Sequence, residues 1–334
     1  MINICTSVKP DFRLVEKYLK DDFETAQLSN FGPCYERLCD ELSVFLNLPA
    51  GKRIVLTSSG HTALMAAYNM FLNKTYTFIR MPSYTFPSTW QAIPYRLEYR
   101  EYENIYSLDS IDLYGNILSI VAPLSIIPDF EVIERTFGMM APIIIDGAAT
   151  FGTKDIYGYG NYYCLSFHAT KTFPLGEGGA VICSKCDEEE IRQYINFGMN
   201  NKKEIFDTGI NGKISEYTCA IGLSILPKMN EVINRRLENA AIYKRRLGSL
   251  VPKSWVDDTI YQTFPIFFPS TRKAEQARKL LTNNNIQHLQ YYKPHQQVWT
   301  QYAQDLYDRN ICLPVHQNVK PQDIDFICDL VLSV

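Results

Sequence analysis

The sequence predicts an α/β fold in which a mostly parallel sheet is flanked by helices and followed by a smaller α+β domain. Apolar strand-like runs alternate with helical segments from about residue 53 onward, which is typical of parallel βαβ units. The run Pro142–Asp146 is continuously apolar up to its final acid, as expected of a strand buried on both faces. From about residue 231 the pattern changes to mixed helix and strand. We therefore expect a large domain with an N-terminal arm over residues 1–230 and a small domain over 231–334.

Length, composition and charge indicate an ordinary globular protein. The chain has 334 residues, of which 46% are hydrophobic and 21% charged, and its net charge is −3. Such a chain has no general attraction to nucleic acid or to anionic membranes. The N-terminus lacks the regions of a signal peptide, and the longest apolar run, 117–127, is broken by Pro123 and too short to span a bilayer. We expect a cytoplasmic protein.

The cysteines do not indicate a disulfide framework, although the chain has nine of them. Cys183 and Cys186 have the spacing of a zinc or redox pair. No neighbouring segment supplies two further ligands, so we expect no metal.

The N-terminal arm is predicted to be extended with one short helix, and Asn30–Pro33 marks its closing turn. Tyr35–Leu46 then has apolar side chains at helical spacing. The strand Arg53–Leu56 leads through a polar turn with three hydroxyls and Gly60 into a helix. A strand, a glycine turn and a helix N-terminus together form an anion site, because free N–H groups and the helix dipole face the turn. This turn fits a phosphate; a plain serine N-cap is the alternative.

The next strand, Tyr76–Met81, is followed by a turn and a helix that includes Trp90. An aromatic side chain at the carboxyl end of a strand can cover the face of a planar cofactor by stacking. Phe86 is the first candidate for this position and Trp90 the second. The alternative for either ring is a place in the core.

Asp146 ends the apolar strand Pro142–Asp146, which follows the predicted strand Ile117–Ala122 and helix Pro128–Phe137. Open α/β sheets bind their ligands at the carboxyl ends of such strands. A carboxylate at this place can pair with a pyridine nitrogen and keep it protonated, which makes the ring an electron sink. The alternative is an Asp that caps a turn.

Lys171 lies between two apolar strands, Tyr162–Phe167 and Ala180–Cys183, and is followed by a glycine-rich turn. An ammonium group among apolar neighbours is costly, but a desolvated lysine suits Schiff-base chemistry with pyridoxal phosphate. The alternative is a surface lysine in a loop.

The remaining chain contains a polar loop between longer elements. Asp187–Phe197 is predicted to be a helix, 198–211 a loop, and Ile214–Leu247 a long helical pattern bent at Pro227. The small domain is predicted to contain two strands and three helices, in the order Tyr261–Phe268, Lys273–Asn283, Ile286–Tyr292, Gln297–Asp308 and Pro321–Leu332.

Together these stretches resemble the DegT/StrS-type sugar aminotransferases, a branch of the fold-type I pyridoxal phosphate enzymes. The similarity runs from Asn30 to about Leu226, with a weaker tail at Leu313–His316. Its most specific pieces are Ser166–Lys171 with Glu177–Gly179, and Gly209–Glu216; its supporting pieces are Ser58–Gly60, Pro82–Phe86 and Asp146–Ala149.

The resemblance implies that pyridoxal 5'-phosphate is the cofactor and assigns its contacts. Lys171 would form the imine with the cofactor and then act as acid and base. Asp146 would pair with the pyridine nitrogen, and Phe86 would stack on the ring. The phosphate would be held by the backbone at Gly60 and His61, by the Ser166 hydroxyl, and by Asn211 from the partner subunit of a homodimer. Glu216 is interpreted as structural.

Two departures from the family affect the site. The family often has Gln or His at the position of Ala149, where it bonds the phenolic oxygen of the cofactor, so another group or a water must replace it here. The segment Tyr99–Ser125 is shorter than usual, so part of the substrate pocket is expected to differ. His168 could lie near the lysine or be a structural histidine.

The presence of Lys171 favours transamination over the dehydration seen in relatives that lack the lysine. The resemblance implies a ping-pong reaction in which glutamate supplies the amine to a keto sugar nucleotide. The loop Gly209–Gly212 looks most like the branch acting on dTDP-4-keto-6-deoxyglucose, giving dTDP-4-amino-4,6-dideoxyglucose. A 3-keto sugar or a UDP or GDP carrier stays open, and so do surface-polysaccharide (lipopolysaccharide O-antigen) and glycosylated-metabolite pathways.

Two rival functions are a non-catalytic cofactor-binding regulator and a different enzyme on the same cofactor. The first is disfavoured because the chain has no separate DNA-binding domain or basic helix. The second is a cysteine desulfurase-like enzyme or an amino-acid aminotransferase, and an arginine placed for the substrate carboxylate would favour the latter. Arg272 and Arg278 are available but lie in no motif that we recognise.

Overall fold

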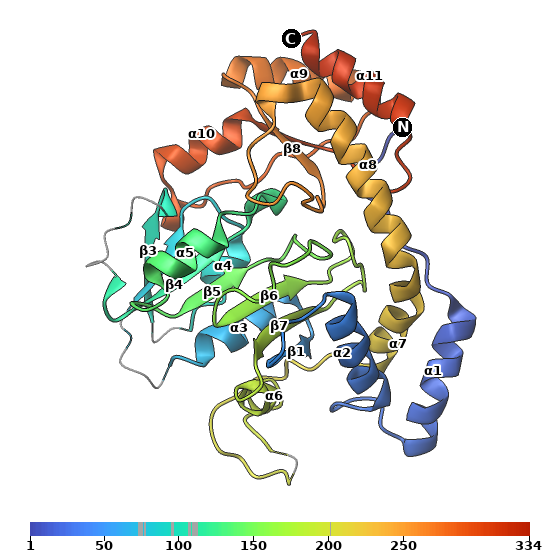
Figure 1. Ribbon diagram of the computed structural model, residues 1–334, viewed down its shortest axis with the longest axis vertical. Coiled ribbons are helices and arrows are strands. Elements are labelled where there is room, and N and C mark those ends of the chain that lie inside the picture. Colours follow the sequence, from blue (N-terminus) through green and yellow to red (C-terminus); the bar gives the residue numbers. More distant parts are fainter. Residues whose placement is uncertain (73–75, 77, 95–96, 106–107, 109–112, 201) are drawn as a thin grey trace.

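The computed structural model describes the whole chain except residues 73–75, 77, 95–96, 106–107, 109–112 and 201. Its centre is a seven-stranded sheet with the order β1-β7-β6-β5-β4-β2-β3 (Figure 1). Only β7 runs antiparallel to its neighbours, so the other strands all end at the same edge. The strands are β1 (Lys52–Thr57), β2 (Phe78–Pro82), β3 (Glu98–Tyr102), β4 (Asn116–Val121), β5 (Ile143–Asp146), β6 (Tyr162–Ser166) and β7 (Gly179–Ser184). The predicted α/β fold is confirmed.

Helices cover both faces of this sheet, as the continuous apolar strands require. In β5, Ile143 and Ile145 join one apolar cluster while Ile144 joins another, because successive side chains point to opposite faces. The first cluster includes residues of α2 (Pro33–Phe45), α5 (Phe130–Phe137) and α7 (Glu216–Ile225). The second includes residues of α3 (Gly60–Asn69) and α6 (Glu188–Tyr194).

The C-terminal part has its own sheet and its own apolar cluster. The long helix α8 (Met229–Leu247) leads from the large sheet to this part (Figure 1). Its two strands, β8 (Phe264–Phe267) and β9 (Asn310–Leu313), pair antiparallel. The surrounding helices are α9 (Thr271–Asn283), α10 (Gln301–Arg309) and α11 (Pro321–Leu332). The cluster unites side chains of α8, α9 and α11 with both strands.

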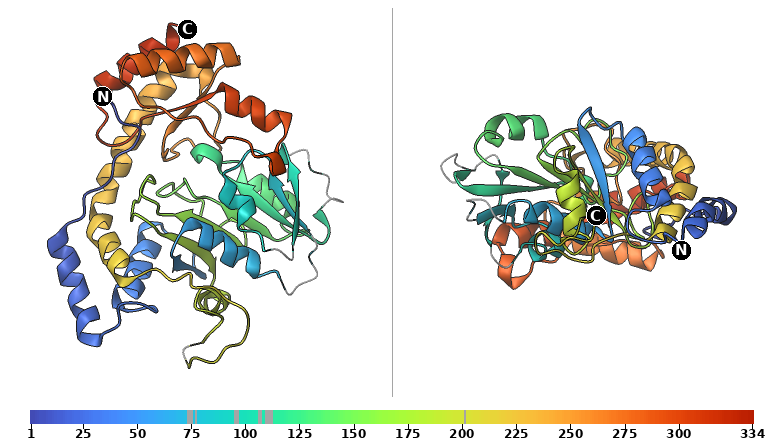
Figure 2. Two further views of the ribbon diagram at one scale, coloured as in Figure 1. Left: turned by 180° about the vertical axis from the view of Figure 1, so that it is seen from behind. Right: turned by 90° about the horizontal axis from the view of Figure 1, so that it is seen from below.

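The N-terminal arm crosses from the C-terminal part to the large sheet (Figure 2). Ile2 exchanges backbone hydrogen bonds with Asn285 and Gln287, of 3.0 and 2.9 Å. The chain then forms α1 (Phe12–Thr25), which packs against α7. Among the described helices, none combines the length and apolar character needed to cross a membrane.

Several predicted elements differ from the observed ones. The predicted strand Ile286–Tyr292 is wrong, because Ile286 and Leu289 form only isolated bridges and β9 takes the place beside β8. The predicted strand Tyr261–Phe268 shortens to β8. The helical pattern Ile214–Leu247 divides at Pro227 into α7, a 3-10 turn and α8. The predicted strand Tyr76–Met81 appears as β2, and its Thr77 lies outside the described residues.

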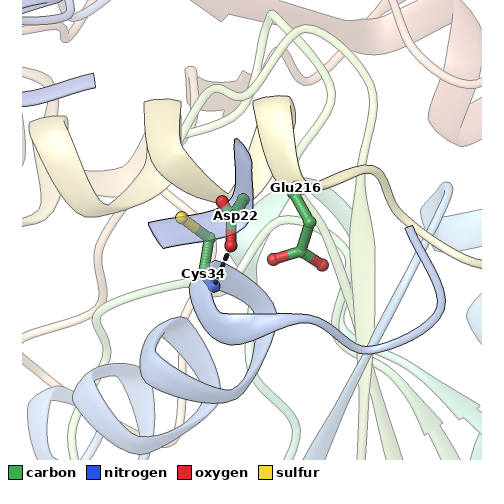
Figure 3. A group of neighbouring side chains, drawn as sticks. All are labelled: Asp22, Cys34 and Glu216. Carbon is green, nitrogen blue, oxygen red and sulfur yellow. Dashed lines mark hydrogen bonds between the residues drawn. The ribbon is translucent and has the colours of Figure 1, made fainter. Parts of the chain in front are cut away.

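Glu216 ties α7 to the beginning of α2. Its carboxylate is fully buried and accepts N–H groups from Gly32 at 2.9 Å and Tyr35 at 2.8 Å. Asp22 of α1 accepts the N–H of Cys34 at 3.4 Å in the same group, as Figure 3 shows. Burial raises the pKa of Glu216, and the two donated N–H groups oppose that shift. These carboxylates satisfy the N–H groups that a helix start leaves without partners, so Glu216 has the structural place expected from the sequence.

Replacing Glu216 with alanine should lower the free energy of unfolding by about 1–3 kcal/mol, because two buried N–H groups lose their acceptor. Glu216→Gln should lower the free energy of unfolding by less, since the amide oxygen of glutamine can still accept one of the two N–H groups. Urea denaturation followed by circular dichroism measures both losses. The exposed Glu275 of α9 gives the control variant Glu275→Ala, and an equal loss in this control would contradict the role of Glu216.

Candidate active site

A cavity of about 350 Å³ lies at the edge where the co-directional strands end. Six of the seven residues predicted for the site line this cavity: Gly60, His61, Phe86, Asp146, Ser166 and Lys171. They come from four separate stretches of the chain, after β1, β2, β5 and β6. A larger cleft of about 610 Å³ shares only Val121 with this cavity and contains none of the predicted residues.

One wall of the cavity is the turn between β1 and α3. Ser59 caps α3 by accepting the N–H of Thr62 at 3.1 Å. Gly60 begins the helix and packs so tightly on Ser166 that a Cβ atom would lie 2.7 Å from the Ser166 Cβ. The first N–H groups of a helix have no partner within it and favour an anion. The turn therefore places Gly60, His61 and the Ser166 hydroxyl at one corner of the cavity, where free N–H groups would suit an anion.

Asp146 lies at the end of β5 with only 5% of its surface exposed. Its Oδ2 accepts the hydroxyl of Thr89 at 2.7 Å, and its Oδ1 accepts the N–H of Ala148 at 3.2 Å. Burial raises the pKa of Asp146, whereas these two hydrogen bonds and the charge of Lys171 lower it. The carboxylate is therefore held in a fixed orientation at the cavity wall.

Lys171 follows β6 and faces the same cavity. Its Nζ donates a hydrogen bond to Oε1 of Gln262 at 2.9 Å. Burial lowers the pKa of this amine to about 8, and the charge of Asp146 opposes the shift. A larger fraction of Lys171 is consequently an uncharged nucleophile near neutral pH than of an ordinary lysine.

Of the two aromatic candidates, Phe86 lines the cavity and Trp90 does not. Phe86 caps α4 (Pro87–Gln91), lines the cavity and remains 51% exposed. Its ring lies edge-on to that of Tyr292, with the ring centres 6.0 Å apart. Trp90 instead lies against His295, at 5.1 Å between ring centres. The geometry thus favours Phe86 over Trp90 as the ring that could cover a planar ligand.

Asn211 does not line the cavity of its own chain. It lies on the loop after α6, pairs with Asn196 as an isolated bridge, and accepts the Lys213 ammonium at 2.9 Å. The same loop returns to the β1 turn, where Gly212 accepts the N–H of Ser58 at 2.7 Å. The predicted contact of Asn211 would have to reach a second copy of the chain.

Sequence reasoning missed three kinds of residue at the cavity. Gln262 contacts Lys171 from a position 91 residues later in the chain. Thr89 holds Asp146 from a helix 57 residues earlier. Tyr291 and Tyr292 come from the segment wrongly predicted as a strand. No local pattern marks these positions, although Thr89 lies between the two aromatic candidates Phe86 and Trp90.

Three further expectations concern neighbouring residues. Ala149 does line the cavity and brings no polar side-chain atom to it. His168 also lines the cavity and lies at its exposed rim, with Nε2 3.8 Å from a carboxylate oxygen of Glu177. Cys183 is buried in β7 while Cys186 is exposed, so the two side chains of that pair lie in different surroundings.

Comparisons with known proteins agree with the resemblance. A model of the DegT/DnrJ/EryC1/StrS aminotransferase family matches residues 130–332. The chain is 26% identical to a dTDP-4-amino-4,6-dideoxy-D-glucose transaminase of Shigella dysenteriae, over 95% of this chain and 94% of that protein. It is 23% identical to a GDP-perosamine synthase of Escherichia coli O157:H7, over 73% of this chain and 69% of that protein.

A solved structure extends the agreement to the fold. An aminotransferase from Bacillus cereus ATCC 10987, described as PLP-dependent, has a TM-score of 0.85 to this chain at 22% identity, and the match covers 99% of both chains. At this identity the likeness concerns the fold. It agrees with the sheet and helix arrangement described above.

The lowered pKa of Lys171 predicts how the protein without cofactor should react with pyridoxal phosphate. Because the uncharged amine is the nucleophile, the rate should rise with pH around a midpoint near 8, instead of near the ordinary value of about 10.4. The growth of visible absorbance after mixing measures this rate at each pH.

Asp146→Asn should move that midpoint to lower pH, because the carboxylate raises the pKa of Lys171. The exposed carboxylate of Asp40 gives the control Asp40→Asn, which should leave the midpoint unchanged. A midpoint near 10 in the unaltered protein would contradict a desolvated lysine.

Proposed function

This chain belongs to the DegT/DnrJ/EryC1/StrS family of sugar aminotransferases, and we propose that it transfers an amino group from glutamate to a keto sugar nucleotide with pyridoxal 5'-phosphate as cofactor. The observation that carries the proposal is the desolvated amine of Lys171 in one cavity with the buried carboxylate of Asp146 and an anion-binding turn. The acceptor that we propose is dTDP-4-keto-6-deoxyglucose, giving dTDP-4-amino-4,6-dideoxyglucose.

The groups around the cavity fit each part of that cofactor. The N-terminus of α3 with the Ser166 hydroxyl suits a phosphate. The fixed carboxylate of Asp146 suits a protonated ring nitrogen, because opposite charges stabilise each other in a desolvated site. Phe86 and Leu124 supply apolar walls for a planar ring.

When bound, pyridoxal phosphate supplies an aldehyde that condenses with amines and a ring that accepts electrons. Lys171 Nζ would hold the aldehyde between reactions and, once released, take a proton from the substrate carbon and return it. Asp146 would keep its negative charge at the ring nitrogen, with Thr89 fixing the direction of the carboxylate. Gly60, His61 and Ser166 would hold the phosphate and so orient the reacting end toward Lys171.

A homodimer with shared active sites is part of the proposal. The loop that carries Asn211 projects from the body of the chain (Figure 1). Near it, Phe197, Ile205 and Phe206 have exposed fractions of 48%, 73% and 66%. Large apolar side chains gathered on a projecting loop are typical of a surface covered by a partner. A second copy would cover them and bring Asn211 to the phosphate corner.

The choice of sugar nucleotide rests on the curated relatives. The dTDP-sugar transaminase of Shigella dysenteriae matches 95% of this chain at 26% identity, whereas the GDP-sugar enzyme matches 73% at 23%. A UDP-sugar transaminase of Campylobacter jejuni matches 97% of this chain at 22% identity, so the dTDP carrier is proposed on the higher identity of the Shigella relative and not on coverage. The GDP relative makes the carrier a variable that the experiment must test.

Purified protein loaded with pyridoxal phosphate should show the visible band of a lysine-bound cofactor, and glutamate should convert it to the amine form. Lys171→Ala should lose the visible band of the lysine-bound cofactor, and borohydride reduction should leave no cofactor attached to the chain. Its rate of amino transfer should fall by at least about 10²–10⁴-fold. Circular dichroism serves as the control for folding. A band that persists in Lys171→Ala would mean that another lysine holds the cofactor.

The amine form of the enzyme should be discharged by dTDP-4-keto-6-deoxyglucose faster than by GDP-linked or UDP-linked 4-keto sugars. Absorbance recovery under single-turnover conditions measures each acceptor. Equal discharge by unrelated 2-keto acids would contradict a sugar nucleotide as acceptor. Cofactor binding without reaction toward any of these acceptors would favour the regulator instead.

A further inference from the structure

Gln262 reaches the one amine on which the proposed chemistry depends. Its Oε1 accepts a hydrogen bond from Lys171 Nζ at 2.9 Å, and both side chains line the cavity. The glutamine belongs to the segment before β8 and thus approaches from the C-terminal part of the chain. Asp146, by contrast, affects Lys171 through its charge and comes from the large sheet.

The main chain around Gln262 is held in place from several sides. Its N–H donates to Ser125 Oγ at 3.2 Å, and Ser125 in turn donates to the carbonyl oxygen of Ala149 at 2.6 Å. The N–H of Ile260 donates to Thr153 Oγ1 at 3.0 Å. These bonds replace the ladder bonds of a strand, which explains why β8 begins only at Phe264.

Arg236 of α8 fixes the same segment by hydrogen bonds to its carbonyl oxygens. Its Nη1 donates to the carbonyl oxygens of Tyr261 and Gln262, both at 3.0 Å. Only 2% of Arg236 is exposed, and burial lowers the pKa of its guanidinium to about 10. Burying a cation against neutral carbonyls is unfavourable. Fixing this segment through Arg236 therefore lowers the stability of the folded chain.

The side chain of Gln262 is oriented by a hydrogen-bonded chain that leads to the rim of the cavity. The N–H of Thr170 donates to His168 Nδ1 at 3.3 Å, so that nitrogen is an acceptor and the proton of a neutral ring lies on Nε2. Thr170 Oγ1 lies 3.0 Å from the same Nδ1 and therefore donates to it. The oxygen of that hydroxyl then accepts Gln262 Nε2 at 3.4 Å.

This direction of donation decides which end of the amide meets the lysine. With Nε2 committed to Thr170, Oε1 is the end that faces Lys171, and it can only accept. At the outer end, His168 Nε2 lies 3.8 Å from a carboxylate oxygen of Glu177, which is too far for a hydrogen bond. From Lys171 to His168 each group donates to the next one outward, and hydrogen bonds aligned in this way strengthen one another.

We propose that Gln262 is a further catalytic residue, which holds the free amine of Lys171 in one orientation, and that Thr170 and His168 are positioning residues that fix the amide. The inference rests on the proposed function. In the stage of the reaction when Lys171 is released, one of its N–H bonds is held by Oε1. The lone pair that must take and return a proton therefore keeps a fixed direction toward the cavity.

The test measures the reactivity of Lys171 and the amino transfer separately in Gln262→Leu. Acetic anhydride reports the uncharged amine, and mass spectrometry reads acetylation at Lys171 as a function of pH. The full chain is used, both without cofactor and loaded with pyridoxamine phosphate. Loss of the oxygen that stabilises the ammonium should lower the midpoint from near 8 by about one pH unit, so that acetylation at pH 7 rises about fivefold. Single-turnover amino transfer should fall about 10- to 100-fold, because the amine is no longer oriented.

A rise in acetylation of Lys171 together with a fall in amino transfer would distinguish an orienting role of Gln262 from a role in packing alone. Gln262→Glu should raise the midpoint, since it adds a negative charge beside Lys171. His168→Leu should raise acetylation and lower amino transfer, as Gln262→Leu does. In His168→Asn the Oδ1 atom can replace Nδ1 as acceptor, so acetylation and transfer should stay close to those of the unaltered protein. The partly buried Gln304 on α10 supplies the control Gln304→Leu, which should match the unaltered protein.

Gln262→Leu leaves every titratable side chain that lines the cavity in place, so a shift in the midpoint of Lys171 is caused by loss of the amide. These titratable side chains are His61, Asp146, His168, Lys171, Glu177, Tyr291 and Tyr292. Unaltered midpoint and transfer in Gln262→Leu would overturn the inference. A parallel fall of acetylation and transfer with a lower melting temperature would also overturn it, as packing alone predicts that result. Acetylation of the cofactor-free chain does not depend on any substrate, so this outcome is separable from failure of the proposed function.

Discussion

The opposed charges of Lys171 and Asp146 are the constraint on which the arrangement of the site depends. Burial alone would neutralise both groups, because it lowers the pKa of the amine and raises that of the carboxyl. Each group limits the shift of the other, and Thr89 and Gln262 supply the hydrogen bonds that water would otherwise provide. The result is an amine whose pKa is lowered to about 8 beside a buried, hydrogen-bonded carboxyl group, in one desolvated cavity.

The topology of the sheet explains why these groups meet. All strands but β7 end at the same edge, so Asp146 after β5 and Lys171 after β6 approach from neighbouring strands. The reversed strand β7 begins at that edge, directly behind the turn between β1 and α3. A Cβ atom on Gly179 would lie 2.5 Å from the N atom of Gly60, so this glycine is required for β7 to pass close behind the turn. Gly179 thus allows the turn between β1 and α3 to keep its place at the cavity.

The positions of groups that are marked by a local sequence pattern could be predicted from the sequence. The apolar run that ends in Asp146, the turn at Gly60 and the lysine between two strands lie where they were expected, because burial and chain direction determine them. The strand expected at Ile286–Tyr292 was wrong, since its pairing depends on β9, a distant partner. Gln262 could not be assigned from the sequence, because its place depends on side-chain anchors at Ser125, Thr153 and Arg236.

The two parts of the chain contribute differently to the cavity. The large sheet supplies the anion corner, the carboxylate and the lysine, whereas the C-terminal part supplies Gln262, Tyr291 and Tyr292. Hydrogen bonds from Tyr84 to the Tyr291 carbonyl and from the N–H of Leu124 to the Tyr292 hydroxyl join the parts at the cavity. Since the partner of the lysine lies on the C-terminal side, the relative position of the two parts sets how the amine is held. A substitution at the boundary between them can therefore change how Lys171 is held without changing Asp146 or the turn between β1 and α3.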